Sequence, residues 1–273
     1  MKENARLKKI ATQIRIDIVT MLASAGSGHP AGSLGIADIL TTLYFMLLHH
    51  NPKQPNWPGR DRFLLSAGHL CPALYATLAE AGYFPKKQIT TLRSLGSTLQ
   101  GHSHRGSPRG VEIDAGSLGQ GLSVACGMAL AAKLNKQKHK IVCLTSDGEH
   151  DEGQTWEAVM FAAKYKLDNL IEFVDRNCIQ IDGSTEKIMP LEPFEKKYLA
   201  FGWSVEKING NDIMQIIKAY KKALNNKGKP TVIIAKTTPG KGISFMEGDC
   251  QWHGKAPTTE EAEKAIRELK LLK

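Results

Sequence analysis

An aspartate and an asparagine stand about thirty residues apart, and each follows a short run of apolar and β-branched residues. Asp147 comes after residues 140–145, and Asn177 comes after residues 169–174. As strands of a parallel sheet, these runs would end at the same sheet edge, where open α/β sheets bind ligands. A carboxylate, an amide oxygen and a nearby main-chain carbonyl suit Mg²⁺ or Ca²⁺ bound together with phosphate oxygens. Singly, Asp147 could cap the next helix and Asn177 could form a turn, but their spacing favours a cation site.

Four of the nine histidines directly adjoin glycine in predicted loops: His29, His69, His102 and His253. An imidazole near neutrality can donate to a phosphate or relay protons to hydroxyl and carbonyl oxygens. One such histidine usually makes an ordinary loop hydrogen bond, whereas four in similar contexts indicate a shared site. A zinc site built from Cys71, His102 and His104 is the competing interpretation, and no compact ligand set in the sequence supports it.

The elements that must position these side chains alternate along the chain. Apolar residues at helical spacing predict helices over residues 4–25, 36–48, 71–81, 122–134, 153–165, 212–224 and 258–272. Apolar and β-branched runs predict strands over residues 63–65, 140–145, 169–174, 203–207 and 231–235. This alternation predicts an α/β fold in which a parallel β-sheet is flanked by helices on both faces, as a single domain over residues 1–273.

Two glycine-rich stretches interrupt the pattern. Residues 28–35 are expected to form a turn that opens the helix over 36–48. Residues 94–121 are rich in glycine, serine and histidine, and a loop of this length is usually functional or disordered. Apolar residues within the loop, and the helix that follows it, favour an ordered, functional loop.

The composition excludes several classes of protein. The 273 residues are 42% hydrophobic and 23% charged, which is typical of a globular protein rather than a disordered one. The longest apolar run, residues 39–48, is far shorter than the roughly 20 residues that span a bilayer. The N-terminal residues lack the features of a signal peptide, and the five cysteines contain no C-x-x-C pair, so we expect a cytoplasmic protein with reduced thiols and no membrane association. The net charge of +9 comes from scattered lysines, and with 7% aromatic residues this does not favour nucleic-acid binding.

Several motifs, taken together, resemble one family. The Asp-Gly pair and the asparagine thirty residues later resemble the thiamine diphosphate-binding motif, and the whole chain is similar to the N-terminal subunits of split transketolases. The matching motifs occur in order as Ser27-Gly28-His29-Pro30, Ser66-Ala67-Gly68-His69, Gly101-His102, Gly116-Ser117-Leu118-Gly119-Gln120-Gly121, Glu152-Gly153-Gln154-Thr155-Trp156-Glu157-Ala158, Val174-Asp175-Arg176-Asn177, Gln180-Ile181-Asp182-Gly183, Gly240-Lys241-Gly242 and Trp252-His253-Gly254. The resemblance implies a thiamine diphosphate-binding fold and transfer of a two-carbon ketol unit from a ketose phosphate, such as xylulose 5-phosphate, to an aldose phosphate, such as ribose 5-phosphate.

The resemblance also implies a role for individual residues. Asp147, Asn177 and the main-chain carbonyl of Ile179 are expected to hold Mg²⁺, with Ca²⁺ or Mn²⁺ as alternatives, against the cofactor diphosphate. The expected catalytic residues are His29, His69, His102 and His253. The expected cofactor contacts are His69, Gly116, Ser117, Leu118, Gly148, Glu149, Asn177 and His253. Glu152 and Glu157 match acidic residues at the family's dimer contact, and a solvated helix face is the alternative for both.

The family completes its active site with a pyrimidine-binding domain that carries the glutamate activating the cofactor. By resemblance, this chain is expected to meet that domain as a separate C-terminal subunit in an α2β2 assembly. Two alternatives are a subunit of a specialised enzyme that acts on a modified or branched sugar, and a cofactor-binding subunit without turnover.

Three departures from the family pattern concern the site. Ser146 replaces the first glycine of the usual Gly-Asp-Gly, and Ala67 stands where related split subunits often carry lysine. His104 and Arg105 stand where a proline and an acidic residue are more common. The extra basic groups suggest the hypothesis that His104 or Arg105 contacts an anionic acceptor sugar.

Overall fold

A five-stranded parallel sheet forms the centre of the computed structural model, which describes residues 2–272. Its strands lie in the order β1 (Arg62–Leu65), β2 (Ile141–Ser146), β3 (Leu170–Arg176), β7 (Thr231–Lys236) and β6 (Ser204–Asn209). Every neighbouring pair is parallel, so all five strands end at the same edge of the sheet. The five strands predicted from the sequence are all present.

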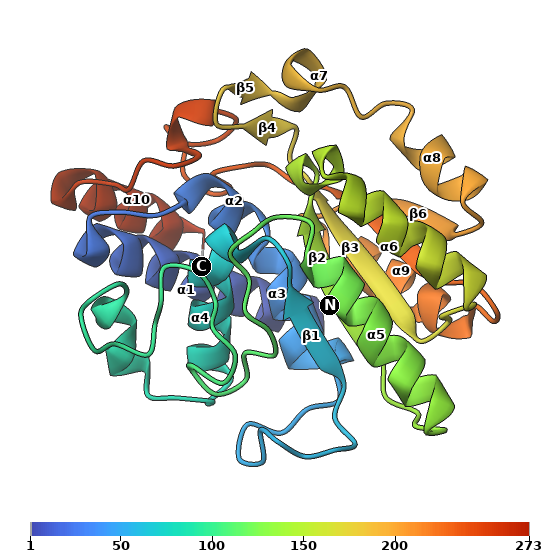
Figure 1. Cartoon of the computed structure of the whole chain (residues 1–273). Coiled ribbons are helices and arrows are strands. Elements are labelled where there is room, and N and C mark those ends of the chain that lie inside the picture. The colour runs from blue at the N-terminus through green and yellow to red at the C-terminus, as the bar shows by residue number, and fades with distance from the viewer. Residues whose placement is uncertain (1, 273) are drawn as a thin grey trace.

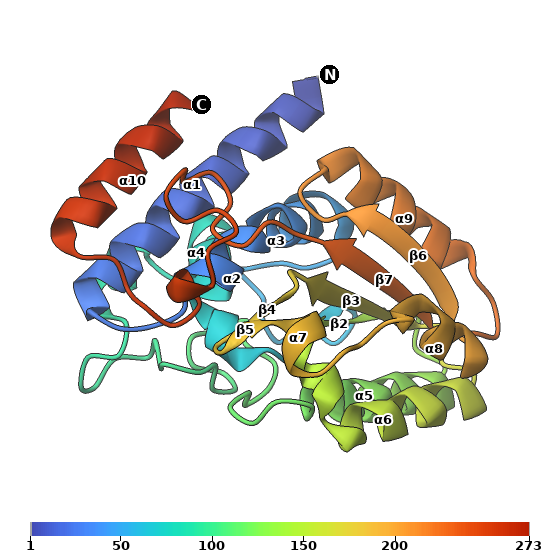
Figure 2. The same cartoon turned by 90° about the horizontal axis from the view of Figure 1, so that it is seen from above.

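Helices cover both faces of this sheet (Figures 1 and 2). One layer consists of α1 (Lys2–Ala25), α3 (Ala37–Thr42), α4 (Cys71–Glu80), α9 (Ile213–Asn225) and α10 (Thr259–Leu271). The other consists of α5 (Gly121–Leu134), α6 (Gly153–Lys164) and α8 (Phe194–Ala200). Alternate residues of β2 enter the two cores, since Val142 and Leu144 pack with the first layer and Ile141 and Cys143 with the second. The predicted α/β fold with helices on both faces is confirmed.

The segment after α1 differs from its sequence-based expectation. Residues 30–35, expected as a turn, form helix α2 (Pro30–Gly35), and the helix expected over 36–48 consists of α3 and a π-helical turn over Leu43–Leu47. Pro30 starts α2 because its missing N–H and fixed φ suit the first helical position. Gly32 lets this helix pack closely, since a β-carbon there would lie 2.6 Å from a methyl carbon of Leu70. Glycine was a sign of close packing here, not of a turn.

Three small elements near the end of β3 were not predicted. These are the hairpin of β4 (Ile179–Gln180) and β5 (Gly183–Ser184), the single helical turn α7 (Thr185–Ile188), and α8. Each is too short to show a clear hydrophobic period.

The glycine-rich stretch is a loop, as predicted, as far as residue 120, since Gly121 already begins α5, and it runs beside the carboxyl end of β1. Isolated bridges join Ser103 to Ala115 and His104 to Ser107 within it. Gly68 allows the loop to approach, because a β-carbon on Gly68 would lie 1.6 Å from the carbonyl oxygen of Ala115. Within residues 2–272, no helix has both the length and the apolar character needed to cross a membrane.

Candidate active site

Asp147 and Asn177 meet at the carboxyl edge of the sheet, as their spacing predicted. β2 and β3 are neighbours with Ser146 paired to Asp175, and the N–H of Asp147 donates to the carbonyl of Asp175 at 3.1 Å. Both side chains line a cavity of about 190 Å³. The other lining residues are His69, Leu118, Ser146, Gly148, Ile179, Gln180, Ile181, Asp182 and His253.

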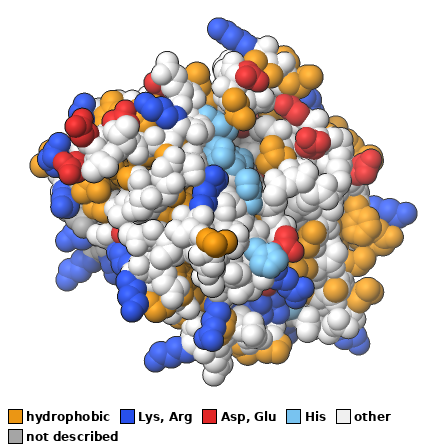
Figure 3. Space-filling model, turned by 60° about the vertical axis from the view of Figure 1, so that its left-hand side comes forward, with side chains coloured by type: hydrophobic (Ala, Val, Ile, Leu, Met, Phe, Trp, Pro, Cys, Tyr) orange, Lys and Arg blue, Asp and Glu red, His pale blue; other side chains and the backbone are white. Residues whose placement is uncertain are grey.

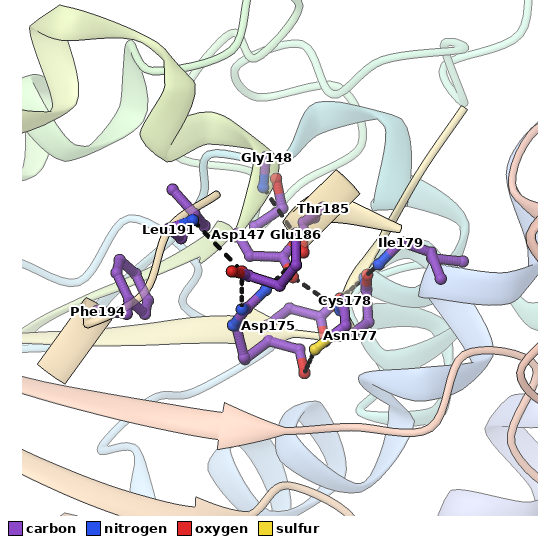
Figure 4. A network of polar contacts seen from close by, with 12 residues as sticks. Asp147, Gly148, Asp175, Asn177, Cys178, Ile179, Thr185, Glu186, Leu191 and Phe194 are labelled. Atoms are coloured by element: carbon purple, nitrogen blue, oxygen red, sulfur yellow. Dashed lines mark hydrogen bonds and ion pairs between the residues drawn. The ribbon is translucent and has the colours of Figure 1, made fainter. Parts of the chain in front are cut away.

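The Asp147 carboxylate is 1% exposed and held by three donors (Figure 4). Its Oδ2 accepts from the N–H of Cys178 at 2.8 Å and from Arg176 at 3.0 Å, and its Oδ1 accepts from the N–H of Gly148 at 2.9 Å. Burial raises the pKa of Asp147, while these donors act in the opposite direction. The carboxylate is therefore fixed in position at the wall of the cavity.

Arg176 links this carboxylate to the segment that follows the hairpin. Its guanidinium donates to Thr185 Oγ1 at 2.7 Å, to Glu186 at 2.5 Å and to Glu192 at 3.3 Å. Burial alone would lower the pKa of Arg176, but the nearby Asp147 and Glu186 carboxylates raise it above its ordinary value. Arg176 is not among the site residues expected from the sequence, although a cation directly before Asn177 is a visible signal.

Asn177 is oriented by its neighbours. Its Nδ2 donates to Asp175 Oδ2 at 2.8 Å, and its Oδ1 accepts from the N–H of Ile179 at 2.9 Å. The amide nitrogen is thus committed to Asp175, and the amide oxygen has a second lone pair available for a cation. An aspartate, an asparagine oxygen and the adjoining backbone are a donor set that fits a hard divalent cation.

The alternative zinc site is not formed. Among residues 2–272, no group of three or more His, Cys, Asp or Glu side chains is placed to hold a metal ion. His104 instead lies 2.6 Å from Asp114, and the Cys71 thiol faces the carbonyl of Gly101 at 3.2 Å.

Three of the four predicted histidines form one cluster. The ring centroids of His29 and His69 lie 5.1 Å apart, and His253 lies 5.7 Å from each of them. His29 precedes α2, His69 lies in the turn before α4, and His253 follows the 3₁₀ turn Cys250–Trp252. On the face shown in Figure 3, histidine side chains gather in a strip along a shallow hollow.

This cluster is uncharged at neutral pH. Burial and the neighbouring His253 lower the pKa of His29 to about 4, and burial and His29 lower the pKa of His69 to about 3. The Nδ1 atoms of His29 and His253 are buried and have no hydrogen-bond partner within residues 2–272. Buried nitrogens without partners are costly, so the cluster is suited to a ligand that supplies hydrogen-bonding groups.

His102 is exposed and does not line the cavity. Burial and the nearby Arg93 lower its pKa. Arg93 donates to Ser27 Oγ at 3.2 Å and to the Gly101 carbonyl at 3.4 Å, and its charge also acts on His29. Nothing in the sequence singled out Arg93, because its proximity to His29 and His102 depends on the path of the loop over 94–121.

The remaining expected cofactor contacts are divided between the cavity and its surroundings. Leu118 and Gly148 line the cavity, whereas Gly116 and Ser117 are exposed and outside its lining. Glu149 is fully buried behind the wall, where its carboxylate accepts from the Gly119 N–H at 2.9 Å. Glu149 therefore holds the loop that carries Leu118.

The two residues expected at a dimer contact, Glu152 and Glu157, are exposed on α6 or just before it. Of the departures, Ser146 keeps a regular strand end, since its N–H donates to Glu149 at 2.8 Å. Arg105 lines a different cavity, at the other end of the sheet.

A second polar network lies under α8, directly behind the cavity. Glu172 of β3 is fully buried, and it accepts from Thr145 at 2.9 Å and from the Tyr198 hydroxyl at 2.8 Å. Tyr198 also meets His150 Nε2 at 2.8 Å. Burial raises the pKa of Glu172 to about 8 and lowers that of His150 to about 4, so both groups are mainly neutral at pH 7.

Comparison with known proteins agrees with this geometry. Residues 6–271 match the family model described as "Transketolase, thiamine diphosphate binding domain". The chain belongs to the transketolase family. Its expected similarity to transketolase N-terminal subunits, drawn from the sequence motifs, is confirmed.

Several relatives in this family align over nearly the whole chain. The 6-deoxy-6-sulfo-D-fructose transketolase subunit SqwG of Clostridium sp. is 45% identical, with 96% of both chains covered. An apulose-4-phosphate transketolase subunit of Actinobacillus succinogenes is also 45% identical, with 97% of this chain and 96% of that protein covered. The crystal structure of transketolase from Campylobacter jejuni superposes with a TM-score of 0.91 at 38% identity, and covers 97% of this chain. This chain spans only 42% of that transketolase.

Proposed function

We propose that this chain is the diphosphate-binding subunit of a two-subunit transketolase, which moves a two-carbon ketol unit from a ketose to an aldose. The observation that carries the proposal is the cavity at the end of β2 and β3. There a fixed carboxylate, Asp147, faces a cluster of neutral histidines with unpaired ring nitrogens. An anchored cation site beside groups able to move protons fits thiamine diphosphate chemistry.

The residues that follow β2 and β3 at the cavity, Asp147, Gly148, Asn177 and Ile179, which we call the metal loop, fit a divalent cation and a diphosphate. Asp147, the Asn177 oxygen and the main-chain carbonyl of Ile179 would hold Mg²⁺, and the same oxygen ligands also accept Ca²⁺ or Mn²⁺. Gly148 leaves room for a ligand, since a β-carbon there would meet nothing closer than 3.8 Å. When bound, thiamine diphosphate supplies an acceptor for the electron pair of the broken carbon–carbon bond.

The histidines carry the proton steps in this proposal. Because their pKa values lie well below neutrality, His29 and His69 each present one N–H and one free ring nitrogen at pH 7. A neutral imidazole can therefore donate a hydrogen bond to a sugar carbonyl oxygen or accept one from a sugar hydroxyl. A proton taken from the hydroxyl would leave an alkoxide on the sugar and an imidazolium, which returns the proton in the reverse half of the reaction. His253 is placed to share these steps, and His102 would meet substrate further out, beside Arg93.

The proposed substrates are sugars with an anionic terminal group. Arg93 makes no ion pair with a carboxylate within residues 2–272, and its charge reaches the histidine cluster. Xylulose 5-phosphate and ribose 5-phosphate fit this requirement. A modified sugar is the second candidate, because two relatives are named for 6-deoxy-6-sulfofructose and apulose 4-phosphate. His104, which is already paired with Asp114, and Arg105, which lines another cavity, are less well placed than Arg93 to meet the acceptor.

The proposed partner is a pyrimidine-binding C-terminal subunit in an α2β2 assembly. Relatives of nearly the same length are named as subunits, which supports a partner for this chain. Glu152 and Glu157 would lie at the contact, and the exposed Met160 and Phe161 on α6 give that surface apolar area. We also propose that this whole chain folds as one domain.

Reconstitution tests the function. The purified chain is mixed with its cognate C-terminal subunit, thiamine diphosphate and Mg²⁺, and ketol transfer is measured with xylulose 5-phosphate, apulose 4-phosphate and 6-deoxy-6-sulfofructose as separate donors. We expect no transfer by the chain alone and turnover of at least one donor by the mixture. Full activity of the isolated chain would contradict the shared site. Cofactor binding by the mixture without turnover of any donor would instead indicate a non-catalytic subunit.

A further inference from the structure

The sheet carries a second polar concavity at its opposite end, where β1 and β2 begin. A cavity of about 450 Å³ and an adjoining one of about 330 Å³ share the lining residues Asn56, Arg60, Arg105 and Glu112. The first residues of the two strands, Arg62 and Ile141, are paired in the sheet and both line the larger cavity. Because Asp147 follows the last residue of β2, this region lies a full strand length away from the candidate active site.

Four arginines define this region, which we call the arginine cavity: Arg60, Arg62, Arg105 and Arg109. Only Arg60 is neutralised directly, by Glu112 at 2.7 Å. Arg62 donates to the main-chain carbonyls of Arg60 and Pro58, which carry no charge. Within residues 2–272, neither Arg62, Arg105 nor Arg109 forms an ion pair with a carboxylate.

One of the arginines without an ion pair, Arg62, is half-buried. Burial and the adjacent Arg60 lower the pKa of Arg62, while the Glu112 and Asp61 carboxylates act in the opposite direction without reversing it. Among residues 2–272, Glu112 is the single acidic residue in the lining, and both its carboxylate oxygens already accept from Arg60, at 2.7 and 2.8 Å. Arg105 and Arg109 are exposed beside it. Guanidinium groups that converge on one cavity gain most from an anion that accepts several hydrogen bonds, and phosphate groups match their planar donors.

The rest of the lining adds a neutral donor and an apolar wall. Burial and Arg62 lower the pKa of His139, so its ring is neutral and can donate one N–H to an anion. Met128, Ala131 and Ala132 of α5 line the larger cavity beside it. The volume of each cavity lies within the range of about 300–1,000 Å³ typical of small-molecule sites. A ligand that matches this lining would be strongly anionic at one end and largely apolar at the other.

We propose that the arginine cavity binds a nucleoside diphosphate or triphosphate, with its phosphates on Arg62, Arg105 and Arg109 and its nucleoside against the Met128 wall. The site is separate from the metal loop. It shares one segment with the candidate active site, because the loop over 94–121 contributes Arg105 and Arg109 here and Leu118 there.

Calorimetric titration of the full chain with ADP in 150 mM salt tests this site. We expect ADP to bind, inorganic pyrophosphate to bind more weakly and adenosine not to bind detectably. The variant carrying both Arg105→Ser and Arg109→Ser should weaken ADP binding at least about tenfold, because it removes two guanidinium groups that would donate charge-assisted hydrogen bonds to the phosphates. Neither guanidinium pairs with a carboxylate of residues 2–272, and an unchanged melting temperature would verify that the variant is folded.

Two matched controls show whether binding depends on these arginines in particular. The variant carrying Arg267→Ser and Lys270→Ser removes the same charge from the exposed surface of α10 and should leave ADP binding unchanged. Asp147→Ala alters the metal loop and should also leave it unchanged. Absence of ADP binding to the natural chain, equal losses in the α10 variant, or a loss confined to Asp147→Ala would each overturn the proposal. Equally tight binding of pyrophosphate would overturn the role of the apolar wall and with it the nucleoside class.

Discussion

The candidate active site and the polar network behind it lie on opposite sides of the turn after β2, and they are completed in different ways. Behind the turn, every carboxyl oxygen of Glu149 and Glu172 has a hydrogen-bond partner in this chain, and these partners include Ser66, Gly119 and Tyr198. In the cavity, ring nitrogens of the histidine cluster are buried without a partner in the described chain. The first region is a finished scaffold, whereas the second is complete only with a ligand.

This contrast indicates how the chain combines a rigid fold with an open site. Glu149 joins the ends of β1 and β2 to the loop that carries Leu118, so the cavity walls are fixed before any ligand arrives. The energetic cost of open polar groups is limited to the cavity, where neutral imidazoles avoid the larger penalty of buried charge. Substitutions in the two regions should therefore produce different kinds of defect.

The largest expected effect separates ligand binding from folding. Asp147→Ala removes the carboxylate expected to meet the cation and leaves the charge of the diphosphate less compensated. We expect the affinity for thiamine diphosphate and Mg²⁺, measured by calorimetry on the mixture with the C-terminal subunit, to fall roughly 100-fold or more. The chain should still fold, because Arg176 retains Glu186 and Glu192 as partners.

Asp151→Ala is the matched control for this substitution. Asp151 lies on the same turn, is exposed and bonds Gln180 at 2.9 Å without lining the cavity. The affinity of the Asp151→Ala variant for thiamine diphosphate and Mg²⁺ should change less than about threefold. If both variants lost the same affinity for the cofactor, the effect would belong to the turn as a whole and not to the Asp147 carboxylate. The contrast between an open site and a finished scaffold would then be wrong at this turn.

Much of the fold could be predicted from the sequence because its signals are local. The apolar runs of all five strands and the periodic patterns of α1, α6, α9 and α10 fall within a few residues of the structure. The failures occurred where packing overrode local preference. The glycines of α2 suggested a turn, although Gly32 is there so that the helix can approach Leu70.

The site was predictable to a smaller extent. Asp147 and Asn177 could be brought together because strand ends of a parallel sheet converge, and the histidine cluster followed from motifs. Arg93 could not be placed, since its position depends on where an irregular loop returns. Arg176 stands at the end of a predicted strand, but its partners Glu186 and Glu192 lie on a segment whose path the sequence does not determine. The sequence also did not distinguish Glu149, a buried support, from Gly148, which lines the cavity one residue earlier. Burial at a turn is decided by tertiary packing.

The second prediction concerns the closed network and should affect stability rather than binding. The pKa of Glu172 is about 8 in the folded chain and about 4.5 in the unfolded one, so the folded state binds more protons between these values. Stability from this group is complete below pH 4.5 and is lost as the pH rises toward 8. Glu172→Gln has no proton to lose. Its free energy of unfolding relative to the natural chain should therefore rise by roughly 1.4 kcal/mol per pH unit through this window.

Urea unfolding at pH 5.5, 6.5 and 7.5 measures this difference directly. Glu263→Gln makes the same chemical change on the exposed surface of α10 and serves as the control. A difference that stays constant with pH for Glu172→Gln would mean that the network holds an ionised carboxylate. The affinity for thiamine diphosphate should remain within about threefold of the natural value, in contrast to Asp147→Ala.

The smallest effect lies at the boundary between the two regions, at Cys178. This residue has a φ of +64°, and Arg93, the other strained residue near the cavity, has a φ of +61°. A residue with a β-carbon pays about 1–2 kcal/mol to adopt this conformation, and glycine avoids that cost. Part of the gain is lost again, because glycine makes the unfolded chain more flexible and so favours unfolding. Cys178→Gly should therefore stabilise the chain by about 0.5–1 kcal/mol, measured as a small rise in melting temperature, and it keeps the N–H that Asp147 accepts. Cys178→Ala retains the β-carbon and should show no such gain; an equal gain from alanine would assign the effect to loss of the thiol instead of relief of strain. The strain at Cys178 has a structural reason, because the backbone there aims its N–H at the Asp147 carboxylate, which also lines the cavity.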